Sequence, residues 1–306
     1  MSFKLPKFAH QYGAGIIQRC EDLITAGIWG GLHINRFRRW LNNFLTDEER
    51  YFSACVLDAL IYRSDDQTLA LTRQLFQRVL PDMTRKSAPV RGSVDDWVDQ
   101  LKVQHPQADP HVRLVPVIGP GDPPTKSGFL VARALKRYLR IDPNWIIWPA
   151  GVGNAIASGV DIIVFIDDFL GTGDQFEAFA NSTGVASRFG DAYTIYAPLA
   201  AHETGIKKLG QVFPGLRVAA AETLDASGSL FDPTSRTFDD ETNTAQDALD
   251  FYLNLLQTKN IQLTGPERRG YGQLELAYTF QHAAPDNCLP IFWWNQTKNW
   301  MPLFDR

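Results

Sequence analysis

The stretch VDIIVFIDDFLGTGDQ (residues 160–175) joins an apolar run to two adjacent carboxylates and a glycine-rich turn. The run at 160–166 is typical of a strand that is buried on both faces of a parallel sheet. Asp167 and Asp168 follow it, and the next segment, QFEAFANST, has the pattern of a helix. Strand, acid pair, small-residue loop and helix together predict a ligand site at the carboxyl end of a strand.

Apolar runs and helical patterns alternate around this stretch. The expected strands are LVPVI (114–118), IIW (146–148), AYTIYAPL (192–199) and LRVAAAETL (216–224). The expected helices are 129–139, 175–183, 202–213 and 243–257, and the segments 274–282 and 289–294 look extended. Such alternation predicts an α/β domain with a parallel sheet that helices cover on both faces.

Residues 1–104 are expected to form a helical N-terminal region. Thr46 is followed by three acids, which is typical of a helix start. The segment 66–80 repeats a helical pattern that Pro81 is expected to end. A proline-rich segment begins near 105, and we place a boundary there. Residues 105–306 then form the α/β domain with a C-terminal extension.

Composition and charge exclude several classes of protein. The formal net charge is −4, whereas a protein that binds nucleic acid by neutralising phosphates is usually basic. Cys20, Cys55 and Cys288 are far apart, which disfavours a zinc site or a disulfide framework. No apolar run approaches the roughly 20 residues that span a bilayer, and the N-terminus lacks a signal-peptide core. We therefore expect a soluble cytoplasmic protein.

The acid pair and its loop suit a phosphorylated ribose. Carboxylates accept hydrogen bonds from sugar hydroxyls or hold Mg²⁺ through water. Glycines let backbone N–H groups approach an anion, and the following helix start adds partial positive charge. A single acid at this place would fit a solvent-facing strand end. Two acids followed by Leu-Gly-Thr-Gly favour a ribose phosphate site instead.

A P-loop ATPase is the competing nucleotide-binding interpretation. Its phosphate loop would have to lie in GPGDPPTKSG (119–128). That motif requires a glycine directly before the lysine, where this chain has Thr125, and another at position 120, which is Pro120. Prolines donate no N–H to a phosphate. The ATPase interpretation is therefore disfavoured.

The segment IIVFIDDFLGTGDQ resembles the phosphoribosyl pyrophosphate motif of type I phosphoribosyltransferases. The resemblance implies that Asp167 and Asp168 are the catalytic acids that contact the ribose hydroxyls and hold Mg²⁺. It also implies a phosphoribosyl-binding loop made of Gly171, Thr172, Gly173, Asp174 and Gln175. The preceding loop would bind pyrophosphate through Lys126, Ser127 and Gly128.

Other segments, among them YAPLAAHETGI, SLFDPTSRTF and PDNCLPIFWWNQTKNWMPLFDR, resemble phosphoribosyltransferase-like proteins of bacterial conflict systems. This resemblance, to a family that includes retron-associated members, implies an antiphage effector that acts on phosphoribosyl pyrophosphate or a nucleotide at the C1 N-glycosidic position. A reverse transcriptase or ATPase partner is also implied. The alternatives are an inactive nucleotide-sensing module and a scaffold that docks on the partner. Gln175, where the motif usually has Thr or Ser, favours the sensing module, as does the short segment 149–159.

Overall fold

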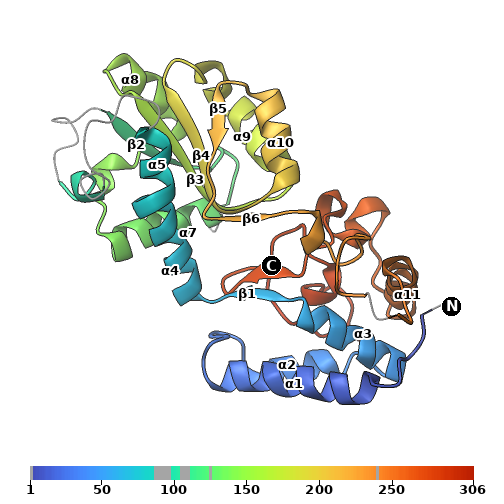
Figure 1. The fold of residues 1–306 in the computed structure, drawn as a ribbon. Coiled ribbons are helices and arrows are strands. Elements are labelled where there is room, and N and C mark those ends of the chain that lie inside the picture. The colour runs from blue at the N-terminus through green and yellow to red at the C-terminus, as the bar shows by residue number, and fades with distance from the viewer. Residues whose placement is uncertain (1–2, 86–97, 104–110, 124–125, 239–240) are drawn as a thin grey trace. The chain divides into compact units, whose positions relative to one another are not determined.

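The computed structural model describes the chain apart from residues 1–2, 86–97, 104–110, 124–125 and 239–240 (Figure 1). Contacts divide the chain into two units, Met1–Gln67 with Asp225–Arg306, and Thr68–Leu224. The boundary predicted near residue 105 falls on residues outside the described part and stays a prediction. Among the described residues, no helix combines the length and apolar character needed to cross a membrane.

In its described part, the Thr68–Leu224 unit contains a five-stranded sheet in which every strand pairing is parallel. Its strands are β2 (Val112–Pro116), β3 (Ile162–Leu170), β4 (Tyr193–His202), β5 (Leu216–Val218) and β6 (Glu222–Leu224). β3 lies between β2 and β4, and both β5 and β6 pair with β4. The predicted parallel α/β fold is confirmed.

The strand predicted over 216–224 is two short strands instead of one. β5 pairs with the first half of β4 and β6 with its last residues. Between them the carbonyl of Ala221 accepts a hydrogen bond from the Gln74 side chain, 3.1 Å away. The prediction of one continuous strand was wrong because this backbone group bonds a side chain.

The strand predicted at 146–148 is only a single bridge. Ile146 bridges Leu114 of β2 in the parallel sense, and the N–H of Ile147 donates to the Leu114 carbonyl at 2.9 Å. Because Leu114 sits opposite Val164 on its other side, this bridge lies on the edge of β2 away from β3. The chain thus steps outward from β2 and then returns to form β3. A switch point of this kind, between β2 and β3, is where open α/β sheets bind ligands.

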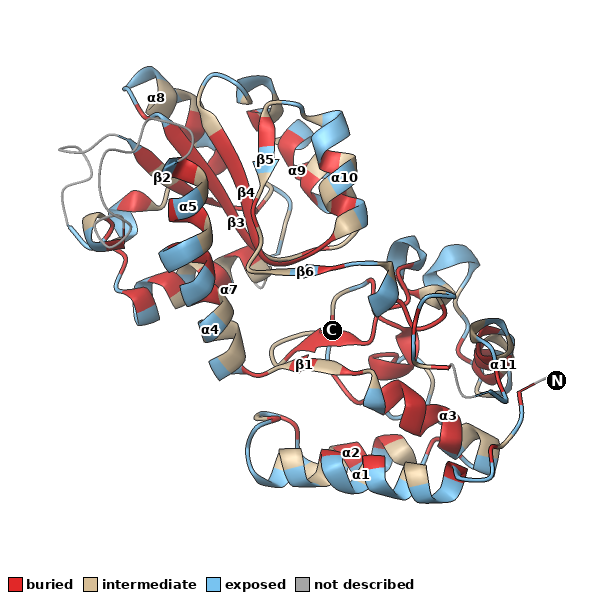
Figure 2. Cartoon of the chain, in the orientation of Figure 1, coloured by how far each residue is buried: buried red, intermediate tan, exposed pale blue. Residues whose placement is uncertain are grey.

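Most of β3 is buried (Figure 2), and its side chains alternate between two clusters. Ile162, Val164 and Ile166 join one cluster, whereas Ile163 and Phe165 join the other. The first cluster includes residues of α7 (Ser127–Ala134) and the π-helical turn Leu135–Leu139. The second includes residues of α8 (Val152–Ala157), α9 (Asp174–Ser182) and α10 (Glu203–Val212). Helices therefore cover both faces, as the apolar run predicted.

Pro81 does not end the helix that precedes it. α4 (Asp65–Gln74) continues through a π-helical turn (Leu75–Val79) into α5 (Leu80–Arg85). Proline lacks an N–H and crowds the carbonyl four residues earlier. The wider π turn directly before it shifts the hydrogen-bond pattern, since the Leu80 N–H donates to the Leu75 carbonyl. The helix can therefore pass the proline, and the predicted stop was wrong.

The other unit combines the start and the end of the chain. Its main elements are α1 (Ala9–Thr25), α2 (Ile34–Leu41), α3 (Asp47–Asp58), β1 (Ile61–Arg63), α11 (Ala245–Thr258) and β7 (Tyr278–Phe280). β1 and β7 pair in parallel. The Thr46 side chain accepts from the Glu49 N–H, which confirms the predicted start of α3.

The C-terminal segment packs against α2. The Trp40 indole donates to the Ile291 carbonyl at 2.8 Å, and the Asn43 amide bonds the backbone of Met301 twice. Residues 289–294 were predicted to be extended, but Pro290–Phe292 is a 3₁₀ turn that opens on its proline. The terminal aromatic residues therefore form core rather than an extended strand.

Candidate functional site

The predicted acid pair lies at the switch point between β2 and β3. Asp167 and Asp168 belong to β3 itself, which extends to Leu170 because its pairing with β4 continues. Neighbouring residues of a strand point to opposite sides. The two acids therefore occupy different surroundings at the same end of the sheet.

Asp167 is buried and bonded within the protein, with 1% of its surface exposed. Its Oδ1 accepts from the Ser127 hydroxyl at 3.1 Å and from the Asp168 N–H at 3.0 Å. Its Oδ2 accepts from the Tyr196 hydroxyl at 3.3 Å. Burial raises the pKa of Asp167 well above its usual value, and the Asp168 charge raises it further. Asp167 thus links the start of α7, the end of β3 and β4.

Asp168 is half-buried, so its carboxylate is the more accessible of the two. The resemblance assigns both acids the same role, whereas the structure gives them unequal surroundings. Asp168 can contact a ligand that arrives from solvent. Asp167 positions Asp168 by accepting a hydrogen bond from its backbone N–H. The arrangement favours Asp168 as the residue that contacts a ribose.

The glycine-rich stretch after β3, residues 171–174, is called here the β3 loop. Gly173 has a φ of +90° and caps α9, a conformation that favours glycine. The Thr172 hydroxyl donates to Asp174 Oδ2 at 2.6 Å, which closes the loop on itself. Gln175 follows in the first turn of α9 and is exposed. The structure therefore brings the predicted phosphate-binding residues together at a helix N-terminus, where anions bind favourably.

Lys208 on α10 is a residue of this site that the sequence did not reveal. Its ammonium forms an ion pair with Asp174 and another with Glu177, the latter at 2.6 Å. The hydrogen bond to Asp174 and then that to Glu177 raise the pKa of Lys208, so it stays charged. The two acids would otherwise repel a phosphate at the start of α9. Lys208 offsets one of these two negative charges.

Gly205, also on α10, lets that helix touch the β3 loop. A Cβ at this position would overlap the carbonyl oxygen of Gly171 and lie 2.7 Å from Leu170 Cδ1. A glycine in a helix interior usually has a packing reason, because it costs about 1 kcal/mol relative to alanine. That signal was present in HETGIKKLG and pointed to close packing here.

The described part of the segment after β2, residues 117–123 and 126, is called here the β2 loop. Asp122 Oδ2 accepts from the Gly119 N–H at 2.7 Å and pairs with Lys126 Nζ at 2.6 Å. Partial burial works to raise the pKa of Asp122, but the Lys126 and Gly119 bonds outweigh it and lower that pKa. The predicted pyrophosphate lysine is thus held by an acid of its own loop.

Ser127 and Gly128 begin α7, and both serve the packing of that helix. Ser127 donates to Asp167, as described above. Gly128 is buried, and a Cβ there would lie 3.1 Å from the Val117 carbonyl oxygen. α7 therefore starts directly against the end of β2, with its N-terminus beside the acid pair.

The described residues contain no group of three or more His, Cys, Asp or Glu side chains that could hold a metal. Asp168 offers an accessible carboxylate, whereas the oxygens of Asp167 are buried and accept hydrogen bonds within the protein. Mg²⁺ is commonly bound by one or two carboxylates together with waters and the phosphates of a substrate. The donor set therefore fits a magnesium ion that arrives with a phosphorylated ligand.

His202 ends β4 at the same edge of the sheet. The sequence left open whether the pair His202-Glu203 belongs to a site or begins a helix. The His202 Nδ1 accepts from the Thr204 N–H at 3.2 Å and caps α10. The helix-start interpretation is confirmed.

Comparison with known proteins agrees with this arrangement. The PRTase-CE family model matches residues 37–306, which include the sheet, both loops and the C-terminal segment. A search of curated protein sequences found no match. Because the family match covers most of the sequence, the chain belongs to the PRTase-CE family, a phosphoribosyltransferase-like family.

Proposed function

We propose that the chain binds phosphoribosyl pyrophosphate or a nucleotide at the switch point and makes or breaks the N-glycosidic bond at C1. The observation that carries this proposal is the half-buried Asp168, backed by buried Asp167, directly before the β3 loop and α9. A carboxylate accepts hydrogen bonds from ribose hydroxyls. The loop and the helix start then take the 5′-phosphate.

Asp168 has the direct role in this proposal and Asp167 a positioning role. Breaking the bond at C1 develops positive charge on the ribose, which a nearby carboxylate stabilises. Asp167 holds the backbone N–H of Asp168 and so fixes where that carboxylate lies. Catalysis would then rest on positioning and electrostatics rather than on a nucleophile.

Pyrophosphate would lie at the β2 loop, near Lys126 and the start of α7. The Lys126 side chain is 18% exposed, and its ammonium already contacts Asp122. An anion there would share the lysine with that acid. Mg²⁺, held by Asp168 and the ligand's own oxygens, would supply charge neutralisation for the pyrophosphate.

The biological setting we propose is antiphage defence, beside a retron reverse transcriptase or an ATPase. Support comes from the resemblance of the C-terminal segment and the acid-pair motif to effectors of bacterial conflict systems. The second candidate function is a nucleotide-sensing module without turnover. The observation that favours it is Gln175, an exposed amide at a position where the motif usually supplies a hydroxyl.

Calorimetric titration with phosphoribosyl pyrophosphate and Mg²⁺ tests the ligand class. We expect Asp168→Asn to weaken binding by about 10- to 100-fold, which is the loss of a charge-assisted hydrogen bond. Asp161→Asn is the matched control, since Asp161 is an exposed acid just before the opposite end of β3. Equal binding by both variants would contradict the proposal.

Turnover and biological role need two further measurements on the same variants. Pyrophosphate release or altered nucleotide pools would identify an enzyme, whereas tight binding without either would identify a sensor. In a phage-protection assay, we expect Asp168→Asn to lose protection while Asp161→Asn retains it. Full protection by a folded Asp168→Asn protein would contradict both functions.

A further inference from the structure

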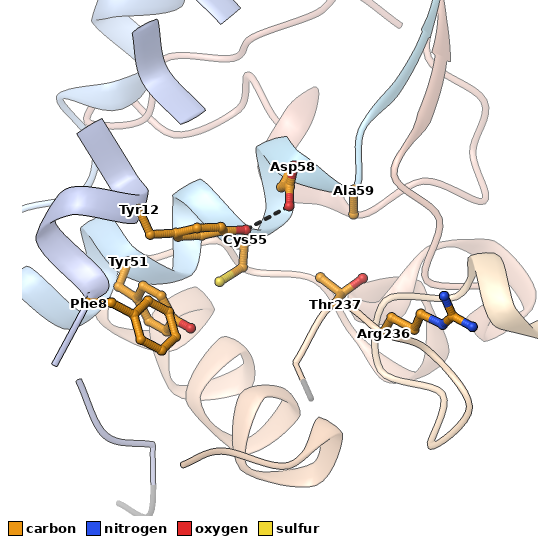
Figure 3. A pocket seen from close by; sticks show the side chains of 8 residues that line it. All are labelled: Phe8, Tyr12, Tyr51, Cys55, Asp58, Ala59, Arg236 and Thr237. Atoms are coloured by element: carbon orange, nitrogen blue, oxygen red, sulfur yellow. Dashed lines mark hydrogen bonds between the residues drawn. The ribbon is translucent and has the colours of Figure 1, made fainter. Parts of the chain in front are cut away.

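A cavity lies in the unit formed by Met1–Gln67 and Asp225–Arg306, whereas the proposed ribose phosphate site belongs to the other unit. Its volume is about 410 Å³. Small-molecule sites usually measure about 300–1,000 Å³ and combine aromatic walls with a few placed polar groups. The cavity is lined among others by Phe8, Tyr12, Tyr51, Asp58, Arg236 and Thr237 (Figure 3). It is therefore large enough for a nucleoside monophosphate.

One wall of the cavity is aromatic. Tyr12 and Tyr51 pack with ring centroids 5.9 Å apart and planes inclined at 61°. Phe8 meets both edge-on, at 6.2 Å from Tyr12 and 6.4 Å from Tyr51. Tyr51 is buried, whereas Phe8 is 47% exposed at the rim. Because the rings are inclined to one another, a planar base can stack on the exposed ring of Phe8, with the two tyrosines beside it.

The charges of the cavity favour an anion. Asp58 is compensated, because it accepts from the Tyr12 hydroxyl at 2.8 Å and from Arg19 at 2.7 Å. Arg236 is exposed and makes no ion pair with any other residue that the structure describes. It lies with Thr237 across the cavity from the three rings (Figure 3). Since Arg19, outside the lining, pairs with Asp58, the charge of Arg236 is left uncompensated within the lining, at the end remote from the aromatic wall.

We propose that this cavity binds a nucleoside monophosphate, with its base on Phe8, Tyr12 and Tyr51 and its phosphate at Arg236. A guanidinium matches phosphate oxygens with two parallel donors, and Thr237, which also lines the cavity, carries a hydroxyl. None of the lining residues belongs to the unit that carries the acid pair, and we assign a nucleotide bound here the role of an effector rather than a substrate. This inference does not depend on the function proposed for the acid pair.

Calorimetric titration with AMP, GMP, CMP and UMP tests the proposal. The full-length Asp168→Asn protein is used, so that the acid-pair site contributes little. We expect at least one of the four to bind at one site per chain. Arg236→Gln is expected to weaken that binding by about tenfold or more, through loss of a charge-assisted bond. Arg39→Gln is the control, because Arg39 is an exposed arginine of the same unit outside the cavity.

Two smaller ligands test the aromatic wall and the Arg236 end of the cavity separately. The matching nucleoside, which lacks phosphate, should bind Arg236→Gln and its parent equally. Ribose 5-phosphate, which lacks a base, should be insensitive to Phe8→Ala, whereas the monophosphate should lose about threefold to tenfold. No binding by any of the four monophosphates at millimolar concentration would overturn the proposal. Equal losses of monophosphate affinity in Arg236→Gln and Arg39→Gln would overturn it as well. Either outcome leaves the function proposed for the acid pair untouched, because that function is tested by phosphoribosyl pyrophosphate binding to the wild type.

Discussion

The β2 loop and the β3 loop both pair a lysine with carboxylates, but they are held in different ways. In the β2 loop, Lys126 pairs with Asp122, four residues earlier in the same segment. In the β3 loop, Asp174 pairs with Lys208 of α10, 34 residues later. The described part of the first loop is held by its own residues, whereas the second has, besides its internal Thr172–Asp174 bond, an ion pair with a helix elsewhere in the unit. Substitutions in α10 should therefore affect the β3 loop, and substitutions in the β2 loop should act locally.

The largest effect is expected from Gly205→Ala, which places a methyl group where α10 meets the Gly171 carbonyl. Overpacking against backbone should lower the free energy of unfolding by about 3 kcal/mol. Gly210→Ala is the matched control on the same helix, because a Cβ there has nothing within 4 Å. Urea unfolding should show Gly210→Ala unchanged or up to about 1 kcal/mol more stable. A mild effect of Gly205→Ala would mean that the β3 loop does not depend on α10.

The next effect concerns charge at the start of α9. Lys208→Met leaves Asp174 and Glu177 uncompensated beside the proposed phosphate position. We expect affinity for phosphoribosyl pyrophosphate to fall about tenfold, with little loss for ligands without a 5′-phosphate. Lys207→Met is the control, since that neighbouring lysine pairs with Glu203 and is 67% exposed. Calorimetry on both variants makes the comparison, and equal losses would contradict the role given to Lys208.

The difference between contacts within one segment and contacts between distant segments also explains how much of the fold and of the site the sequence predicts. The apolar run before Asp167 implied a strand buried on both faces, and the structure has β3 there. Local signals such as the Thr46 cap were equally informative. The contact of Lys208 with Asp174 links two segments without any local pattern, so no spacing rule predicts it. The unequal burial of Asp167 and Asp168 likewise depends on Tyr196 and Ser127, which come from other elements.

Asp122→Asn tests the local closure of the β2 loop and has a pH signature. Loss of the partly buried pair with Lys126 should cost about 1 kcal/mol at pH 7. The pKa of Asp122 is lowered in the folded protein, so its stabilisation is present above the unfolded value and lost as pH falls through the folded one. Denaturant unfolding at decreasing pH below about 4 should therefore show wild type and variant converging. Asp191→Asn, in the exposed pair with Arg188, should change stability little at any pH.

The smallest expected effect is a gain, from Gln175→Thr at the start of α9. The β3 loop already presents Gly173 and the α9 N-terminus, and the Gln175 side chain is exposed, so a threonine can replace it without loss of core packing. A hydroxyl there adds one donor for a 5′-phosphate, so we expect phosphoribosyl pyrophosphate to bind about threefold to tenfold more tightly. Gln175→Val, similar in shape but without the hydroxyl, should show no gain in the same titration. If both variants bind like wild type, the phosphate lies away from the first turn of α9. The ligand would then be held through Asp168, at the end of β3, and the β3 loop would not contribute to phosphate binding although α10 supports it.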